Sequence, residues 1–159
     1  MDMLTALGVS IGVLIAAWTY VAVGVAALPV WVGIVTWGAF FAAGGKTAGL
    51  TKTIAASLSG LVWAVVAVTL AGRLGGGTAT LAVLVGVIAF AMVLQSRIPL
   101  LSFIPGAFLG AASTVGAGWT DVPSLVKIAV ALVAGAVLGY LSEMLAGMLV
   151  HKKTAPAHA

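Results

Sequence analysis

Residues 100–118 read LLSFIPGAFLGAASTVGAG, and this stretch decides how the rest of the chain is interpreted. It is apolar, yet it holds Pro105, four glycines and the hydroxyl side chains of Ser102, Ser113 and Thr114. A helix that only faces lipid has no use for this mixture, because proline removes a backbone donor and glycine weakens a helix. Two interpretations follow: a helix with a proline kink, or a broken helix whose free backbone groups face a polar pathway.

The composition around this stretch is that of an integral membrane protein. Of the 159 residues, 63% are hydrophobic and only 6% are charged, whereas a soluble domain carries roughly a quarter charged residues. Cysteine is absent, both histidines (His151 and His158) lie in the polar end of the chain, and Asp2, Asp121 and Glu143 are the only acids. The sequence therefore offers no catalytic pair, no cofactor site and no metal site. We expect no enzymatic activity and no nucleic-acid partner, and the net charge of +4 suits the basic loops of a membrane protein.

Cutting the chain at charges, prolines and glycine clusters gives six apolar segments. They are residues 4–27, 29–43, 53–71, 78–95, 98–118 and 124–150. A spanning helix needs roughly 20 apolar residues to cross about 30 Å of hydrocarbon, so the second segment is short and either crosses or re-enters. We predict an all-α membrane protein with a single transmembrane helical domain at residues 1–150 and a polar cytoplasmic tail at 151–159.

The basic residues predict the orientation of these segments in the membrane. With six spans, Arg73 and Lys127 fall on one side, and the other five fall on the side that holds both termini. These five are Lys46, Lys52, Arg97, Lys152 and Lys153. Because basic loops stay in the cytoplasm, the asymmetry predicts a cytoplasmic C-terminus, even if the second segment re-enters.

Two interrupted segments also resemble each other. Residues 28–45 read LPVWVGIVTWGAFFAAGG and residues 98–113 read IPLLSFIPGAFLGAAS, each with an aliphatic-Pro pair followed by Gly-Ala-Phe. If the match is real, residues 4–71 and 78–150 are two three-helix units of opposite orientation, the inverted repeat of many transporters. Otherwise the match arises by chance in a chain rich in Ala, Gly, Val and Leu. In an inverted repeat, interrupted segments at equivalent positions indicate the substrate site.

The candidate pore or solute-binding residues lie mainly on these two segments. They are Trp37, Phe40, Phe41, Ser102, Phe103, Pro105, Gly106, Phe108, Ser113, Thr114 and Glu143. The aromatic residues either form a constriction or pack between helices, and the hydroxyls either line a pathway or bond to their own helix. An acid inside a span is a functional candidate by default, but an ion pair of Glu143 with Lys152 or Arg97 explains it equally well. Gln95 and Arg97 are expected to reach the membrane interface.

The stretches SGLVWAVVAV (residues 59–68) and LLSFIPGAFLGAASTVGAG resemble the YcdZ-like family of small bacterial inner-membrane proteins. The resemblance covers nearly the whole chain and includes the Ser-Phe-aliphatic-Pro-Gly motif at Ser102 to Gly106. It implies a multi-pass protein of the bacterial inner (plasma) membrane without known enzymatic activity. It brings no substrate and no assigned site.

These observations favour a passive channel or facilitator for a small polar solute, either a neutral amide-like molecule or a small weak acid. The expected partners are the lipid bilayer, the solute and further copies of the chain in a homo-oligomer, because six short segments make a thin bundle. One alternative is a membrane scaffold or accessory subunit without transport activity. A second alternative is a proton-coupled small transporter that uses Glu143, although a single intramembrane acid gives it little support.

Overall fold

The computed structural model describes residues 1–119 and 121–150, and the tail predicted at 151–159 lies outside the described residues. The described residues form helices and no strand, which confirms the all-α part of the predicted fold class. The α-helices are α1 (Met3–Val21), α2 (Val30–Ala42), α3 (Lys46–Arg73), α4 (Thr78–Leu94), α5 (Ile104–Ala117) and α6 (Val122–Leu149). A π-helical turn (Ala22–Ala26) extends α1, and two 3-10 turns (Gln95–Arg97 and Pro99–Leu101) connect α4 to α5.

Four of these helices are long and two are short. The spans Met3–Ala26, Lys46–Arg73, Thr78–Arg97 and Val122–Leu149 are long and apolar enough to cross a membrane. Helices α2 and α5 have 13 and 14 residues, which corresponds to about 20 Å at the rise of an α-helix. Each is therefore shorter than the hydrocarbon layer of about 30 Å.

Two predicted segments differ from the helices that form. The third was predicted to begin at residue 53, but α3 begins at Lys46, because Gly44, Gly45 and Lys46 complete the turn before it with φ of 95°, 66° and 56°. The lysines that suggested a loop lie instead on the first turns of α3. The fifth was predicted to be interrupted at Pro105. The segment is interrupted, but at Ser102 and Phe103, so Pro105 lies in the first turn of α5. Proline suits that turn because its missing N–H has no helical partner there.

Each short helix packs on a long helix from the other half of the chain. Helix α5 packs mainly on α3, and α2 packs mainly on α6. A Cβ atom at Gly60 of α3 would overlap the carbonyl group of Ala107 on α5, and one at Gly135 of α6 would overlap the carbonyl group of Gly33 on α2. Small residues thus let the backbones touch, as expected where packing drives the association of helices in lipid.

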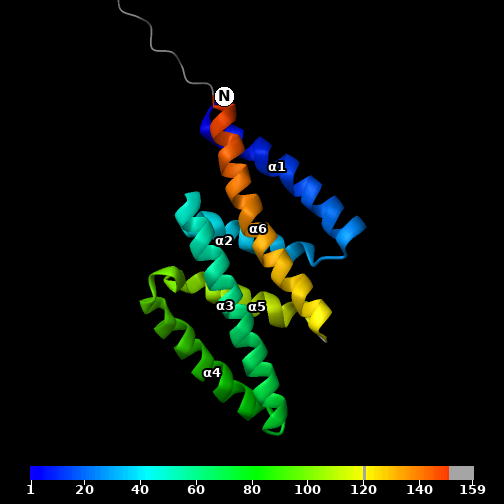
Figure 1. Ribbon diagram of the computed structural model, residues 1–159, viewed down its shortest axis with the longest axis vertical. Coiled ribbons are helices and arrows are strands. Elements are labelled where there is room, and N and C mark those ends of the chain that lie inside the picture. The colour runs from blue at the N-terminus through cyan, green and yellow to red at the C-terminus, as the bar shows by residue number, and fades with distance from the viewer. Residues whose placement is uncertain (120, 151–159) are drawn as a thin grey trace, which may run out of the picture.

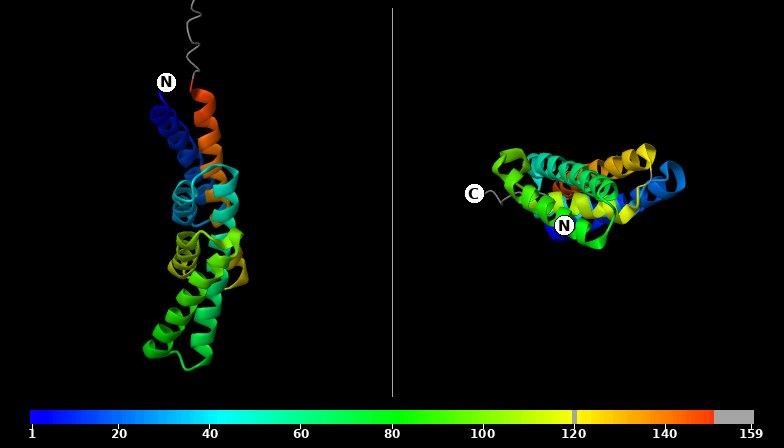
Figure 2. Two further views of the ribbon diagram at one scale, coloured as in Figure 1. Left: turned by 90° about the vertical axis from the view of Figure 1, so that its left-hand side faces the viewer. Right: turned by 90° about the horizontal axis from the view of Figure 1, so that it is seen from below.

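The long helices extend in opposite directions from the two short ones. In Figure 1, α2 and α5 cross the middle of the molecule, α1 lies in the upper half and α4 lies in the lower half. Helices α3 and α6 run through the centre in opposite directions. The left view of Figure 2 shows α2 and α5 end-on, one above the other, with the long helices beside them. Direct contact between α2 and α5 completes the centre of the fold.

The Gly-Ala-Phe match that suggested a repeat does not fall at equivalent places in the two short helices. Gly38 lies in the third turn of α2, whereas Gly106 lies in the first turn of α5. Pro29 directly precedes α2, but Pro99 begins a separate 3-10 turn before α5. The Gly-Ala-Phe match is therefore no evidence for a repeat, and any support for a repeat has to come from the packing of the helices.

Candidate functional site

The polar side chains buried in the described part of the chain are all uncharged hydroxyls. They are Ser10, Thr36, Thr53, Ser57, Ser113, Thr114 and Ser142. Six of the seven lie on α2, α3, α5 and α6, the helices that pack together at the centre of the fold. We call these six side chains the hydroxyl core. It offers hydrogen bonds without charge, so it can contact a neutral polar molecule but supplies no counter-ion.

Most of these hydroxyls bond to nearby carbonyl groups. Thr36 donates to the carbonyl oxygen of Val32 at 2.7 Å, and Thr114 donates to that of Gly110 at 2.8 Å. Such bonds to the preceding turn are the ordinary way to satisfy a helical threonine. Thr53 differs, because its Oγ1 is the one buried side-chain nitrogen or oxygen without a hydrogen-bond partner in residues 1–119 and 121–150.

Ser142 on α6 is linked by hydrogen bonds to α1 and to α2. The indole Nε1 of Trp37 on α2 donates to the Ser142 hydroxyl at 3.1 Å. The hydroxyl of Ser10 on α1 donates to the carbonyl oxygen of Ser142 at 2.8 Å, and the Ser142 hydroxyl itself donates to the carbonyl oxygen of Gly139 at 2.7 Å. A buried hydrogen bond thus fixes the indole of Trp37. The sequence alone had left open whether this residue packs between helices or forms a constriction.

A second polar group connects α3 to the end of α4. Trp63 donates from Nε1 to Oε1 of Gln95 at 2.9 Å, and Nε2 of Gln95 donates to the hydroxyl of Ser59 at 2.9 Å. Gln95 was predicted to extend to the membrane interface, and this is wrong, because its amide is turned inward and both of its ends are bonded. Trp63 explains why the Gln95 amide turns inward, since the indole N–H of Trp63 lies in an apolar setting and requires an acceptor.

Glu143 caps the start of α3. Its Oε2 accepts the backbone N–H of Lys46 at 2.7 Å, and its carboxylate covers Gly45 so closely that a Cβ there would lie 2.9 Å from Oε1. A carboxylate is stabilising at a helix N-terminus, where free N–H groups and the helix dipole meet it. No ion pair joins Glu143 to Arg97 within the described residues, and Lys152, the other proposed partner, lies outside them.

The N-terminus of α6 is capped differently. Asp121 accepts the backbone N–H of Ser124 at 2.8 Å, within a capping box formed by these two residues. Hydrogen bonds from the side chain and the backbone of Ser124 hold the pKa of Asp121 below its usual value. Helix α6 thus supplies its own cap, whereas α3 depends on Glu143 from α6.

The aromatic candidates lie in two separate groups. Phe40 is fully buried and meets Phe41 and Tyr140 edge-to-face, with ring centroids 5.1 and 6.4 Å apart. Phe108 instead borders an apolar hollow of about 310 Å³ between α3, α4 and α5. Phe103 packs on Gly106, where a Cβ would lie 2.5 Å from the ring. The aromatic residues of α2 and α5 are therefore not brought together around one point.

The remaining candidates on α5 divide into buried and exposed residues. Gly106, Ser113 and Thr114 are buried, and Gly106 faces Ala56 of α3, since a Cβ there would lie 3.0 Å from that methyl group. Ser102 is exposed and donates to the carbonyl oxygen of Pro99 at 2.8 Å. Pro105 is exposed as well. The buried face of α5 that meets α3 is thus the part of this stretch that belongs to the centre of the fold.

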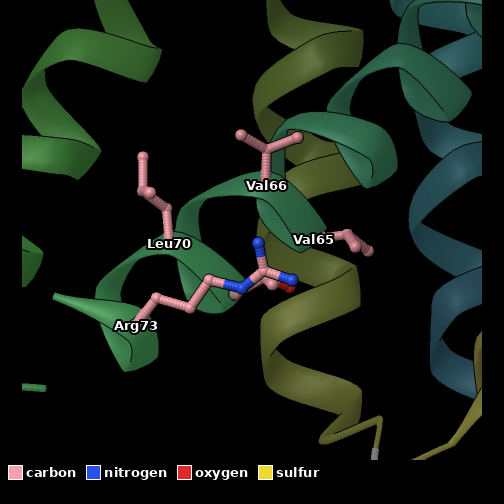
Figure 3. A pocket seen from close by; sticks show the side chains of 5 residues that line it. Val65, Val66, Leu70 and Arg73 are labelled. Atoms are coloured by element: carbon pink, nitrogen blue, oxygen red, sulfur yellow. The ribbon is translucent and has the colours of Figure 1, made fainter.

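Hollows on the surface lie along several helices. Figure 3 shows one of about 310 Å³ near the C-terminal end of α3, where the Arg73 side chain runs beside Leu70, Val66 and Val65. It contains none of the predicted site residues. Another hollow, of about 200 Å³, lies between α1 and α2, and the predicted site residues Trp37 and Phe41 line it.

Comparison with known proteins places the chain in a family. The family model described as "Protein of unknown function (DUF1097)" matches residues 8–147. The chain belongs to this family. The inner membrane protein YcdZ of Escherichia coli (strain K12) is similar to the chain, with 35% identity over 160 residues, 99% of this chain and 94% of that protein.

Two further relatives extend this result. The uncharacterized protein YahC of E. coli K12 is 35% identical over 153 residues, 90% of each chain. The inner membrane protein YcdZ of Salmonella typhimurium (strain LT2) is 35% identical over 115 residues, 72% of this chain and 71% of that protein. No solved structure matches the chain. The resemblance to the YcdZ-like family is confirmed, and the names of the relatives together with the four long apolar helices support a multi-pass protein of the inner membrane.

Sequence reasoning missed two residues of α3 in this DUF1097 protein. Thr53 lies three and seven residues before Ala56 and Gly60, small residues on the same helix face, so its place on a packing face was available as a signal. Lys46, whose backbone binds Glu143, carried no such signal, because its position depends on how two distant helix ends meet.

Proposed function

We propose that this DUF1097 protein is a passive facilitator, or channel, for a small uncharged polar solute, with a pathway along the contact between α2 and α5. The observation that carries the proposal is the pair of short helices, which lie together at the centre and pack on the long helices of opposite halves. Short segments at equivalent positions of two halves are the usual place of a transport site. The protein works in this proposal without a cofactor, and it is not an enzyme.

An inverted repeat of residues 4–71 and 78–150 is part of the proposal. It is supported by the reciprocal packing of α2 on α6 and of α5 on α3, and by the equal lengths of α3 and α6, 28 residues each. Gly60 and Gly135 each meet a carbonyl group of a short helix, and they are 75 residues apart. Lys52 and Lys127 have the same spacing of 75 residues. If the view of Figure 1 is rotated by 180° within the plane of the page, α1, α2 and α3 take the places of α4, α5 and α6, and the reverse.

The chemistry of the centre favours a neutral solute. The hydroxyl core holds no charge, and no charged side chain is buried within residues 1–119 and 121–150. Glu143 is already engaged with the N-terminus of α3, so the structure gives no reason to prefer proton coupling. The α3–α5 and α2–α6 contacts are closed at the level of the backbone, and the proposal therefore assigns the passage to the contact between α2 and α5.

The orientation and assembly follow as further proposals. Six segments that alternate in direction would place both termini in the cytoplasm with Lys46, Lys52 and Arg97, in agreement with the bias of basic residues. The long helices at the two ends, α1 and α4, are the least buried, with 17% and 11% of their spanning windows buried. Their apolar sides are free for lipid or for further copies of the chain in a homo-oligomer.

Solute flux into liposomes tests the proposal. The purified protein is reconstituted, and the entry of urea, acetamide, acetate and sucrose is followed by light scattering, with empty liposomes as the control. We expect urea and acetamide to enter several times faster than into empty liposomes, and sucrose to enter at the control rate. If all four solutes enter at the control rate, the protein is no facilitator for this class, and a scaffold or accessory subunit becomes the better explanation.

A further inference from the structure

The Thr53 hydroxyl is in an unusual state for a membrane helix. Thr53 is fully buried on α3, and its Oγ1 has no hydrogen-bond partner, the one such buried side-chain atom in the described residues. Burying a hydroxyl without a partner is costly, and native structures rarely keep such a group without a purpose. A valine has nearly the same shape and would fill the place without this cost.

Threonines elsewhere in the protein show that a partner is ordinarily available. Thr36 on α2 and Thr114 on α5 are equally buried, and each donates to the carbonyl oxygen four residues earlier. The exposed Thr51, on the same helix as Thr53, bonds back to the carbonyl oxygen of Thr47 at 3.1 Å. The helix around Thr53 therefore offers the same bond, and the hydroxyl of Thr53 is turned away from it.

The neighbours of Thr53 along α3 define where it lies. One turn earlier, Gly49 meets the end of α2, since a Cβ there would lie 3.2 Å from the carbonyl oxygen of Phe40. One turn later, Ala56 meets Gly106 of α5. Positions 49, 53 and 56 share one face of a helix. Thr53 thus lies at the height where α3 passes from its contact with α2 to its contact with α5.

We propose that Thr53 is a solute-binding residue, whose hydroxyl forms a hydrogen bond with an uncharged amide as this molecule passes between α2 and α5. This inference rests on the proposed function, because the passage between α2 and α5 is part of it. A hydroxyl both donates and accepts, which suits the N–H and C=O groups of urea or acetamide. The absence of an internal partner keeps both capacities free for the solute.

The experiment compares two matched substitutions on α3, Thr53→Val and Thr51→Val, in liposome flux of urea and in thermal unfolding of the purified protein. Both remove a hydroxyl and keep the shape of the side chain, but Thr53 is buried and Thr51 is exposed. We expect Thr53→Val to lower urea flux roughly three- to tenfold, the equivalent of one hydrogen bond, while its Tm stays unchanged or rises. We expect Thr51→Val to leave the flux within twofold of the wild type. Thr53→Ser, which keeps the hydroxyl, should retain most of the flux.

The outcomes separate this inference from the proposed function. If the wild type carries urea and Thr53→Val carries it equally fast, Thr53 is no solute-binding residue, and the facilitator proposal stands. A fixed internal water bonded to Thr53 would give this same result. If the wild type carries neither urea nor acetamide, both proposals are overturned. Should Thr53→Val fail to fold, Thr53→Ala removes the same hydroxyl, and its flux decides in the same way.

Discussion

The α3–α5 contact and the α2–α6 contact hold the two short helices in similar places by different means. In the α3–α5 contact, glycine lies on both helices: Gly60 faces the carbonyl of Ala107, and Gly110 faces the carbonyl of Ser57. In the α2–α6 contact, Gly135 meets the backbone of Gly33, but the next glycine, Gly139, meets the ring of Phe40. One contact is thus backbone on backbone at two points, and the other adds a bulky aromatic residue.

The difference concerns how much each contact can adjust. A backbone carbonyl is fixed by its helix, so an added methyl group has to push two helices apart, which is costly in a closely packed interior. At Gly139 the nearest atoms belong to the Phe40 side chain, and the overlap is smaller than that with a backbone carbonyl at Gly60 or Gly110. We therefore expect the α3–α5 contact to be rigid and the α2–α6 contact to tolerate change, although both belong to the centre of the fold.

The largest effect is expected for Gly110→Ala. The new methyl group would overlap the carbonyl of Ser57, so α5 has to move away from α3, at a cost of about 3 kcal/mol or more. The measurement is the free energy of unfolding in detergent. Gly12→Ala on α1 is the control, because nothing lies within 4 Å of its added Cβ, and it should be neutral or slightly stabilising. Equal stability of both variants would show that the α3–α5 contact is looser than the structure indicates.

A smaller effect is expected for Gly139→Ala on α6. The added Cβ would lie 2.7 Å from the ring of Phe40 and 2.9 Å from its Cβ. This overlap is smaller than the overlap with the Ser57 carbonyl at Gly110, so we expect a loss of about 1–2 kcal/mol. The ratio between this loss and that of Gly110→Ala, measured under the same conditions, tests the comparison directly. If Gly139→Ala is as costly as Gly110→Ala, the two contacts are equally rigid, and the distinction between backbone and aromatic neighbours is wrong.

The sequence predicted the helices better than their contacts. Residues 78–95 became α4 almost unchanged, because apolar content and length suffice to identify a spanning helix. Lys46 and Lys52 misled the prediction of where α3 begins, since a charge ends an apolar run without ending a helix. Pro105 was taken for a break because the sequence does not reveal that the chain before it is non-helical, which puts proline in a first turn.

The contacts at the centre depend on tertiary structure and could not be read from periodicity. The cap that Glu143 provides joins residues 97 positions apart, and the inward amide of Gln95 is explained only by the indole of Trp63. Gly106 and Gly110 have the four-residue spacing that is typical of close helix packing, but this spacing does not tell which helix approaches. The solute and the pathway are predictions that the flux measurements address.

The smallest effect is expected for Trp37→Phe in the α2–α6 contact. Phenylalanine keeps an aromatic ring against α6 but loses the hydrogen bond from Nε1 to Ser142. The Ser142 hydroxyl still donates to the carbonyl of Gly139, so no donor is left unpaired, and we expect a loss of about 1 kcal/mol. Ser142→Ala leaves the buried Trp37 N–H without its acceptor and should cost more, because an unpaired buried donor is worse than a removed one. The reverse order in unfolding measurements would mean that the indole ring, and not its hydrogen bond, holds α2 on α6.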